Sequence, residues 1–386
     1  MHRVASKLLV VVVVIAAAFY LDLKMDLFPA AAESEEAIAV DGTNKLERLE
    51  QEIAKQFQAR SEHFSVAYTG DKQELSSKLT DVIRAALSHD DYSAYILESY
   101  IYTIRSWGNK STIALEARYR ETPEQTAAVD RAVSEALRTI IEPGMNEHEK
   151  IKAIHDWIVS NVEYDQSLKH YTAYDAITLG ETVCQGYSLL GYKMLKEAGI
   201  TAIIAEGTVN TGEHAWNMVK LNGAWYHLDL TWDDPVVTAA AAKPAKGTIR
   251  YNYYLKTDEE LRADHQWTKT YPAASVSYAD TIRELEQQSQ PTERTRFSKL
   301  KLALGLHWLE PEYTVSSLEQ LNQMIQSALD SRTTSLEFRY EHGDQFPAAL
   351  KAAFQSVDVP VGYRASYEPY AGKDSLIVRI QLEYAK

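Results

Sequence analysis

The sequence contains a single cysteine, Cys184, within the stretch Thr-Val-Cys-Gln-Gly-Tyr at residues 182–187. Apolar residues at helical spacing follow it, so we expect Cys184 at the N-terminus of a helix. The helix dipole and the free backbone N–H groups at that end lower the pKa of a thiol and favour the nucleophilic thiolate. The same N–H groups could stabilise the negative charge of an attacked carbonyl. The alternative for a lone cysteine is a small apolar core residue.

A histidine and an aspartate lie on the two arms of a predicted β-hairpin. The dipeptide Asn-Gly at 222–223 is a strong two-residue turn signal between the strand-like segments 214–221 and 224–229. If the strands pair from the residues that flank the turn, His214 and Asp229 are diagonal neighbours on one face, roughly 7–8 Å apart between backbones. An aspartate so placed holds the imidazole tautomer and stabilises the imidazolium. Taken singly, each could instead be a strand histidine or a solvated carboxylate.

Other polar residues near these motifs are weaker candidates. His227 shares the hairpin face but lies nearer the turn, which makes it a less favoured base. Asp233 and Asp234 lack the spaced oxygen ligands of a calcium loop, so we interpret them as a solvated turn. Gln185 and Trp216 flank the nucleophile and the histidine and are candidates for contact with the substrate or the oxyanion. No metal site is predicted.

The motifs together resemble the transglutaminase-like superfamily in its bacterial exported branch. Residues 180–187 look like its nucleophile motif, 214–217 like its histidine motif and 229–235 like its aspartate motif. Further segments resemble the lead-in and the closing part of the family's domain, namely 154–156 with 164–165, and 251–254 with 264–267.

This resemblance covers about residues 144–267, and Ser188 stands where many relatives carry alanine. It implies an α+β fold with a papain-like transglutaminase core, in which the cysteine helix packs on an antiparallel sheet that carries the histidine and the aspartate. It also implies that Cys184 is the nucleophile, His214 the base and Asp229 the orienting residue of a catalytic triad. The triad chemistry needs no cofactor.

Apolar periodicity predicts the elements that would position these residues. Helices are expected at 46–57, 72–87, from 123 onward, from 146 to 162 and at 184–198, with strands at 63–68, 100–107, 112–119, 202–205, 214–221 and 224–229. A strand, a helix and a strand are expected near the C-terminus at 335–340, 347–354 and 375–384. The first region shows the same β-α-β order, which predicts a weak internal repeat of α/β modules around the middle domain.

A chain of 386 residues is expected to hold two or three domains of about 150 residues each. Polar composition and the cluster Gln-Gln-Ser-Gln-Pro at 287–291 favour a linker before the last module. The predicted organisation is a signal peptide or membrane anchor at 1–32, an α/β module at 33–143, the transglutaminase-like domain at 144–270, a linker at 271–296 and a second α/β module at 297–386.

The N-terminus and the charge restrict the location and partners. Arg3 and Lys7 precede an apolar run at 8–21, which is shorter than the roughly 20 residues of a spanning helix and suits an export signal. The run is either cleaved or kept as an anchor, so we expect a secreted or cell-surface protein with possible membrane attachment. The net charge of −14 disfavours nucleic acid as a partner. A protein or peptide substrate is expected, and no oligomeric state is predicted.

These observations lead to two functional hypotheses. The first is an exported thiol enzyme that acts on amide bonds through an acyl-enzyme, with hydrolysis favoured slightly over transfer to an amine. The second is a non-catalytic surface module that binds peptides or proteins on the same fold. The sequence does not determine the substrate.

Overall fold

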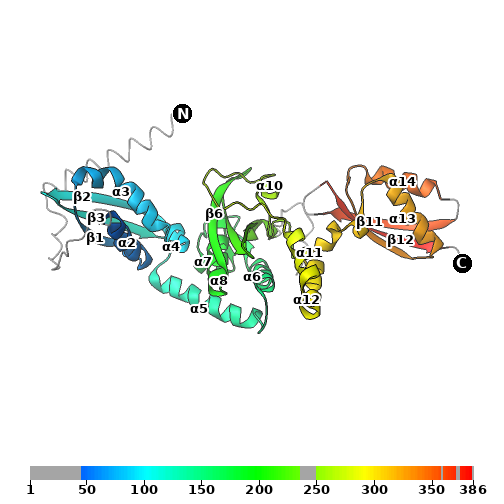
Figure 1. Cartoon of the computed structure of the whole chain (residues 1–386), viewed down its shortest axis with the longest axis horizontal. Coiled ribbons are helices and arrows are strands. Elements are labelled where there is room, and N and C mark those ends of the chain that lie inside the picture. Colours follow the sequence, from blue (N-terminus) through cyan, green and yellow to red (C-terminus); the bar gives the residue numbers. More distant parts are fainter. Residues whose placement is uncertain (1–44, 235–248, 358–359, 371–373, 385–386) are drawn as a thin grey trace, which may run out of the picture. The chain divides into compact units, whose positions relative to one another are not determined.

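The computed structural model describes residues 45–234, 249–357, 360–370 and 374–384 (Figure 1). The chain forms two compact units. Unit 1 runs to His89 and includes Ser99–Arg118, whereas unit 2 comprises Asp90–Glu98 and the chain from Tyr119 onward.

The predicted export segment and the spacer behind it lie outside the described residues. Within the described part of the chain, every helix is too short or too polar to cross a membrane.

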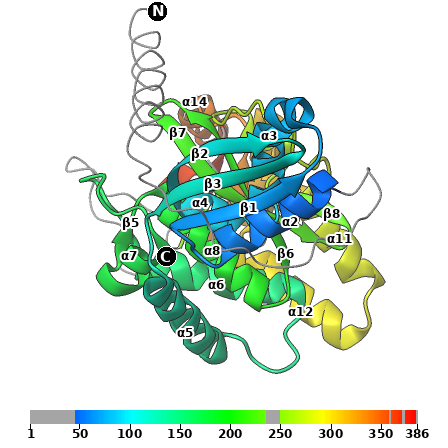
Figure 2. The same ribbon diagram turned by 90° about the vertical axis from the view of Figure 1, so that its left-hand side faces the viewer.

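Unit 1 is a three-stranded antiparallel sheet with two helices. It contains α2 (Lys45–Gln58), β1 (His63–Thr69), α3 (Lys72–Leu87), most of β2 (Leu97–Trp107) and nearly all of β3 (Lys110–Tyr119). The strands lie in the order β1-β3-β2, so the last strand along the chain is the central one (Figure 2). Asp71 caps α3 by accepting the N–H groups of Gln73 and Glu74, which starts the helix directly after the strand. Leu79 is among the fully buried residues of this helix.

The middle of unit 2 holds the cysteine helix, with helices around it. Its elements are α4 (Asp91–Ile96), α5 (Pro123–Ile140), α6 (Glu147–Asn161), β4 (Glu163–Tyr164), α7 (Ala173–Leu179), β5 (Glu181–Thr182) and α8 (Cys184–Glu197). Thr122 and Asn146 close capping boxes at the starts of α5 and α6. Because Val129 and Val133 of α5 pack in the same core as α8, this helix belongs to unit 2 and not to the predicted first module.

An antiparallel sheet completes the middle of unit 2. It is formed by β6 (Thr201–Val209), β7 (Gly212–Leu221) and β8 (Ala224–Leu228) in that order, followed by the short helices α9 (Leu230–Asp233) and α10 (Asp258–Leu261). Leu221 pairs with Ala224 across the turn, as the hairpin motif predicts. Asn217 and Val219 of β7 face α8, where Gly191 allows the helix to approach closely: a Cβ there would meet the side chain of Asn217. The fold is therefore α+β, with the cysteine helix packed on the sheet.

The predicted linker at 271–296 is wrong. This segment contains α11 (Tyr278–Gln288) and the start of α12 (Pro291–Ala303). Tyr278 and Ile282 lie one helical turn apart and are buried in the main core, as is Phe297 on α12. The polar cluster at 287–291 only ends one helix and begins the next, since Pro291 occupies the first turn of α12.

The last part of unit 2 has the same element order as unit 1. After the short 3-10 helices η2 (Leu306–Leu309) and η3 (Pro311–Tyr313) come β9 (Thr314–Val315), α13 (Leu318–Asp330), β10 (Ser335–Tyr340), α14 (Phe346–Gln355), β11 (Val361–Pro369) and β12 (Leu376–Tyr384). The strand order β11-β12-β10 again places the last strand in the centre, and β9 adds a parallel edge strand. Each module thus runs helix, strand, helix, strand, strand, which agrees with the predicted repeat.

The two faces of the C-terminal sheet differ in chemistry. The helices cover one face with an apolar core that includes Phe338 and Val378. On the other face Arg379 forms ion pairs with Glu337 and with Glu368, the latter at 2.7 Å. The apolar face is thus buried under the helices, and the charged face carries the ion pairs of Arg379.

Candidate active site

Cys184 is the first residue of α8, as expected, and is half-buried. The short strand β5 leads into it, and the backbone of Val183 is fixed by a hydrogen bond from its N–H to the carbonyl of His170 (2.9 Å). Gly186 lets the first turn of the helix pack against Thr182, because a Cβ at that position would collide with the Thr182 hydroxyl. The thiol is therefore held at the positive end of a helix dipole.

His214 and Asp229 form the pair that the hairpin register predicts. Nε2 of His214 lies 2.7 Å from Oδ2 of Asp229. The other carboxylate oxygen accepts the backbone N–H groups of Thr231 (3.0 Å) and Trp232 (3.2 Å), so Asp229 also caps α9. His214 is 6% exposed and Asp229 is fully buried.

The charges of this pair stabilise each other in a buried setting. Burial opposes the imidazolium, but the charge and hydrogen bond of Asp229 outweigh it and, together with the adjacent Cys184, raise the pKa of His214 to about 10. Burial also opposes the carboxylate, yet the charge of His214 and hydrogen bonds from both His214 and His265 hold the pKa of Asp229 well below its usual range. Cys184 and His214 line the same cleft, and His214 hydrogen-bonds to Asp229, so the three predicted triad residues are brought together.

The same carboxylate has a second histidine partner that the motif analysis did not assign to the site. Nε2 of His265 lies 3.0 Å from Oδ2 of Asp229, and its Nδ1 lies 2.6 Å from Asp264. The hydroxyl of Tyr253 donates to the far oxygen of Asp264 at 2.5 Å. The dipeptide Asp-His at 264–265 was part of the closing segment noted in the sequence, but only the tertiary structure shows that His265 contacts Asp229.

Comparison with known proteins supports the motif assignment. The family model described as "Transglutaminase-like superfamily" matches residues 134–230, which include Cys184, His214 and Asp229 and end before His265. The chain contains a transglutaminase-like domain. Among curated proteins, "Kyphoscoliosis peptidase" of Mus musculus is 26% identical over 184 residues, which cover 41% of this chain and 27% of that protein.

The human protein of the same name is 27% identical over 153 residues, covering 34% of this chain and 23% of that protein. The chain thus matches only about a quarter of the length of these relatives. Among solved structures, one described as "Crystal structure of a TGase" has a TM-score of 0.27 and 12% identity, covering 47% of this chain and 53% of that one.

In the transglutaminase-like domain, Trp216 packs against His214, and His227 hydrogen-bonds to Trp216. The Trp216 indole is 1% exposed and its N–H donates to Nδ1 of His227 (2.9 Å), whose Nε2 contacts Asp258 (2.8 Å). Trp216 therefore has no free N–H for an oxyanion, contrary to its candidacy, but its ring stacks on His214 with centroids 5.9 Å apart. His227 is engaged in this support, which argues against it as the base.

The Gln185 side chain contacts a wall of the cleft. Its Nε2 donates to the backbone carbonyl of Tyr95 at 2.5 Å. The Tyr95 hydroxyl in turn donates to Glu206 (2.9 Å), which pairs with Lys269 (2.5 Å). Gln185 thus holds Tyr95 beside the thiol. Its side-chain amide is therefore better placed to position the wall of the cleft than to contact an oxyanion directly.

The interpretation of Asp233 and Asp234 as a solvated turn is wrong. Asp233 is fully buried, 3.1 Å from Nε2 of His155, and accepts the backbone N–H of Tyr253 (2.9 Å). Asp234 accepts the hydroxyl of Tyr187 at 2.7 Å. Both carboxylates are drawn inward because α9 turns back over α6 and α8, and they secure the short helix that Asp229 caps.

A cleft of about 660 Å³ opens in front of the thiol and the imidazole. Tyr95 and Tyr171 line it together with Cys184, His214 and residues 206–208 and 266–269. The lining mixes aromatic rings with charged and hydroxyl groups, so it can accept an extended polar chain such as a peptide.

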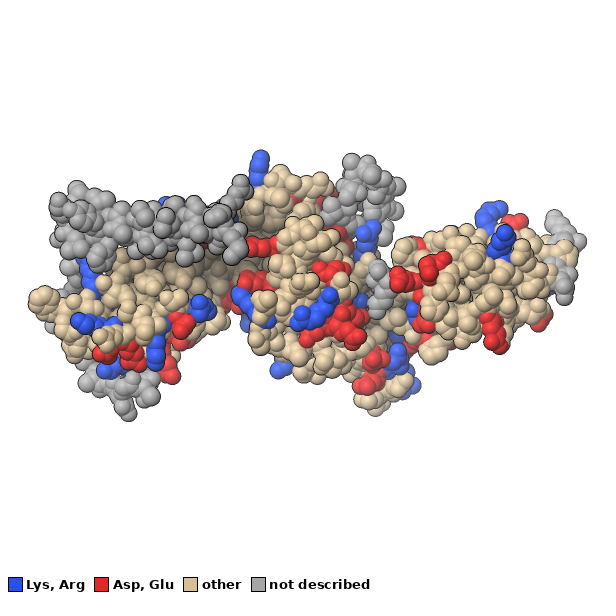
Figure 3. Space-filling view, turned by 90° about the horizontal axis from the view of Figure 1, so that it is seen from above, with Lys and Arg blue, Asp and Glu red and all other residues tan. Residues whose placement is uncertain are grey.

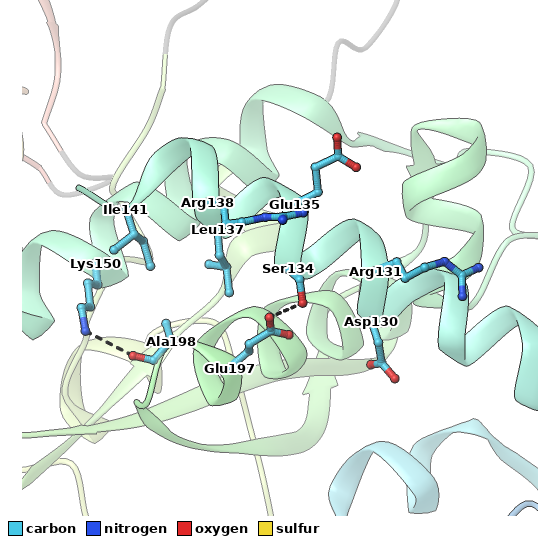
Figure 4. A pocket seen from close by; sticks show the side chains of 10 residues that line it. All are labelled: Asp130, Arg131, Ser134, Glu135, Leu137, Arg138, Ile141, Lys150, Glu197 and Ala198. Atoms are coloured by element: carbon cyan, nitrogen blue, oxygen red, sulfur yellow. Dashed lines mark hydrogen bonds between the residues drawn. The ribbon is translucent and has the colours of Figure 1, made fainter. Parts of the chain in front are cut away.

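A larger and shallower groove of about 850 Å³ lies away from the thiol, between α5 and the end of α8 (Figure 4). Ser134 donates to Glu197 across it, and Lys150 donates to the carbonyl of Ala198 at 3.4 Å. These polar groups satisfy each other within the protein, so the groove is a packing seam between helices.

Two groups among the described residues bring possible metal ligands within 4.8 Å of one another. The first is His214, Asp229 and His265, whose ligand atoms already hydrogen-bond to each other. The second consists of Asp165, His170 and Glu181, where the aspartate accepts three backbone N–H groups of its own loop. Internal hydrogen bonds account for the first cluster, whereas in the second Nδ1 of His170 lies 3.1 Å from Asp165 and 3.4 Å from Glu181.

Proposed function

We propose that the protein is an exported thiol enzyme that cleaves amide bonds of peptides or proteins. The observation that carries this proposal is the continuous Cys184, His214 and Asp229 arrangement at the head of a cleft. The transglutaminase-like match and the peptidase named among the relatives are consistent with it.

The proposed cycle follows from the positions of the three side chains. The Cys184 thiolate attacks the amide carbonyl, and backbone N–H groups in the first turn of α8 stabilise the oxyanion. The His214 imidazolium gives its proton to the nitrogen as the C–N bond breaks, leaving an acyl thioester. His214 then removes a proton from water, which attacks the thioester and releases the acid with the thiolate.

Water is the favoured acyl acceptor because the cleft is open and polar around the thiol. Glu206, Thr208 and Lys269 line it, and a wet site does little to protect a thioester from hydrolysis. A primary amine that enters the same cleft would give transamidation instead.

The test uses the full chain with a glutaminyl peptide and a fluorescent primary amine. Mass spectrometry then distinguishes hydrolysed peptide, amine-labelled peptide and unchanged peptide. We expect hydrolysis, with the product lost in both Cys184→Ala and His214→Ala. Full activity in either variant would contradict the mechanism.

The rival hypothesis is a binding module with an unreactive thiol. Cys184 is the only cysteine in the chain, so alkylation by iodoacetamide reports on it alone. Fast alkylation at pH 6 that slows in His214→Ala supports the enzyme, because a free thiol with a pKa of about 8.5 is almost fully protonated there. Equally slow alkylation of both proteins supports the binding module.

A further inference from the structure

His265 has the geometry of a positioning residue for the proposed triad. It is fully buried, it contacts the same Asp229 oxygen as His214 does, and the two imidazole centroids lie 5.3 Å apart. No step of the proposed cycle uses it. Asp229 is therefore fixed from three sides, by the backbone of α9 and by one histidine on each flank.

The surroundings hold His265 itself in one orientation. Nδ1 faces Asp264, which is in turn anchored by the Tyr253 hydroxyl. The rings of Trp216, Trp232 and Tyr253 pack around the imidazole, with centroids 4.6 Å from Trp232 and 5.3 Å from Trp216. A ring so enclosed cannot turn away from Asp229 without a clash.

The backbone that carries His265 is fastened to the sheet. Thr208 and Gln266 exchange two hydrogen bonds, at 2.7 and 2.8 Å, so the segment adds to the edge of β6. Gly207 makes this approach possible, since a Cβ there would collide with the carbonyl oxygen of Gln266. A glycine on a strand thus sets the distance between His265 and Asp229.

We propose that His265 is a positioning residue that holds the Asp229 carboxylate against His214, and that it acts through its Nε2–H. This proposal rests on the proposed function. If Asp229 is free to shift, His214 loses its oriented partner and the Cys184 thiolate loses a stable imidazolium beside it. The protein then has an intact nucleophile and base but a weaker ion pair.

Three substitutions of the same residue test the proposal. In His265→Gln an amide N–H replaces Nε2–H toward Asp229, whereas in His265→Asn the shorter amide reaches only toward Asp264, and His265→Ala offers neither. We expect alkylation of Cys184 at pH 6 to slow by roughly tenfold or more in the alanine and asparagine variants, because both lose the N–H group that holds Asp229 against the base His214. The glutamine variant should retain most of the wild-type rate.

Two further variants separate positioning from packing. His155 is an equally buried histidine between two carboxylates, Asp233 and Asp156, but it does not touch Asp229. His155→Ala is therefore the matched control, and its Cys184 should be alkylated faster than that of His265→Ala. Gly207→Ala changes no polar side chain but displaces both Gln266 and the Trp216 ring, so it should slow alkylation at least as much as His265→Ala does. Thermal melts of all variants show which are folded.

The outcomes distinguish this proposal from the proposed function. If the glutamine and asparagine variants alkylate at equal rates, or the alanine variant matches wild type, the role of His265 is refuted while the triad stands. If wild type itself labels no faster than a free thiol, both proposals fail. If His265→Ala does not fold, the comparison of glutamine with asparagine at equal stability still decides.

Discussion

At the residue scale, Asp229 performs two tasks with its two oxygens. Oδ1 caps α9 through two backbone N–H groups, and Oδ2 faces His214 and His265. One buried carboxylate thereby joins the start of a helix to the base of the proposed triad. An isosteric amide would keep the capping oxygen and replace the other with a donor.

Asp229→Asn is expected to separate these tasks. The asparagine oxygen can still cap α9, but its N–H₂ faces His214 and removes the charge that raises the pKa of that histidine to about 10. The pKa of His214 should fall far below its value in the native protein, because burial then opposes the imidazolium without the aspartate charge to offset it, and activity should fall by roughly 10³–10⁴-fold, as for a triad aspartate.

The sign of the pH effect follows from the raised pKa of His214. Its imidazolium adds stability below the unfolded value of about 6.5, and this stability is lost as pH rises through about 10. Rates of peptide hydrolysis and urea unfolding between pH 6 and pH 10 check this. In Asp229→Asn the decline of activity at alkaline pH should move to lower pH. A decline at the same pH as in wild type would contradict the pairing of His214 with Asp229.

The residue-scale predictions from sequence succeeded where the partners are close along the chain. A two-residue turn fixes the register of β7 and β8, so the pairing of His214 with Asp229 could be worked out from spacing alone. The contacts of Asp229 with His265 and of Asp233 with His155 join distant segments. Spacing carries no information on such contacts, which depend on how separate elements pack.

At the element scale, α11 illustrates how a polar segment can be part of a core. Its start is fastened by His148 of α6, whose Nδ1 lies 3.0 Å from the Tyr278 hydroxyl and whose Nε2 lies 2.9 Å from the Asn222 side-chain nitrogen. Composition predicted a linker there because most residues of the helix are polar. Two buried positions one turn apart were enough to dock it.

His148 should make this docking sensitive to acid. Nε2 accepts from the Asn222 amide, so the ring must be neutral, and burial lowers its pKa to about 4. Between pH 6.5 and pH 4 the unfolded chain binds a proton that the folded chain does not, so folding stability decreases as pH falls, by on the order of 3 kcal/mol.

Urea unfolding at pH 7 and pH 4.5 measures the effect against His148→Gln. Glutamine does not titrate and can still pair through an amide, so its stability should fall less over this range. The same decrease in both proteins would show that His148 is not the responsible group.

At the whole-molecule scale, the chain repeats one module before and after the proposed catalytic elements in the sequence. The repeat was predictable from element order, and the structure adds that both sheets place their last strand in the centre. The division into units was not predictable, because α4 and α5 read as part of the first module but pack in the core of unit 2. On the face in Figure 3, acidic and basic side chains are interspersed over both units.

Because unit 1 has its own core, we expect it to unfold separately. Leu79→Ala removes a fully buried side chain from α3 and should destabilise unit 1 by about 2–5 kcal/mol. Calorimetry should show one transition moved to lower temperature and another unchanged, with the alkylation rate of Cys184 as in wild type. The matched variant Leu195→Ala, in α8, should lower the temperature of the second transition instead. If Leu79→Ala lowers the temperatures of both transitions, the two units unfold together.

The position of the last strand in each module also has a consequence for how the modules form. β1 and β2 do not pair with each other but each pairs with β3, and β10 and β11 each pair with β12, so the strands flanking the centre lack their common partner until the last strand has been synthesised. A growing chain would therefore expose two unpaired strand edges in each module until its final strand arrives. Each sheet should then assemble in a single late step, which makes the last strand of a module the part that commits it to folding.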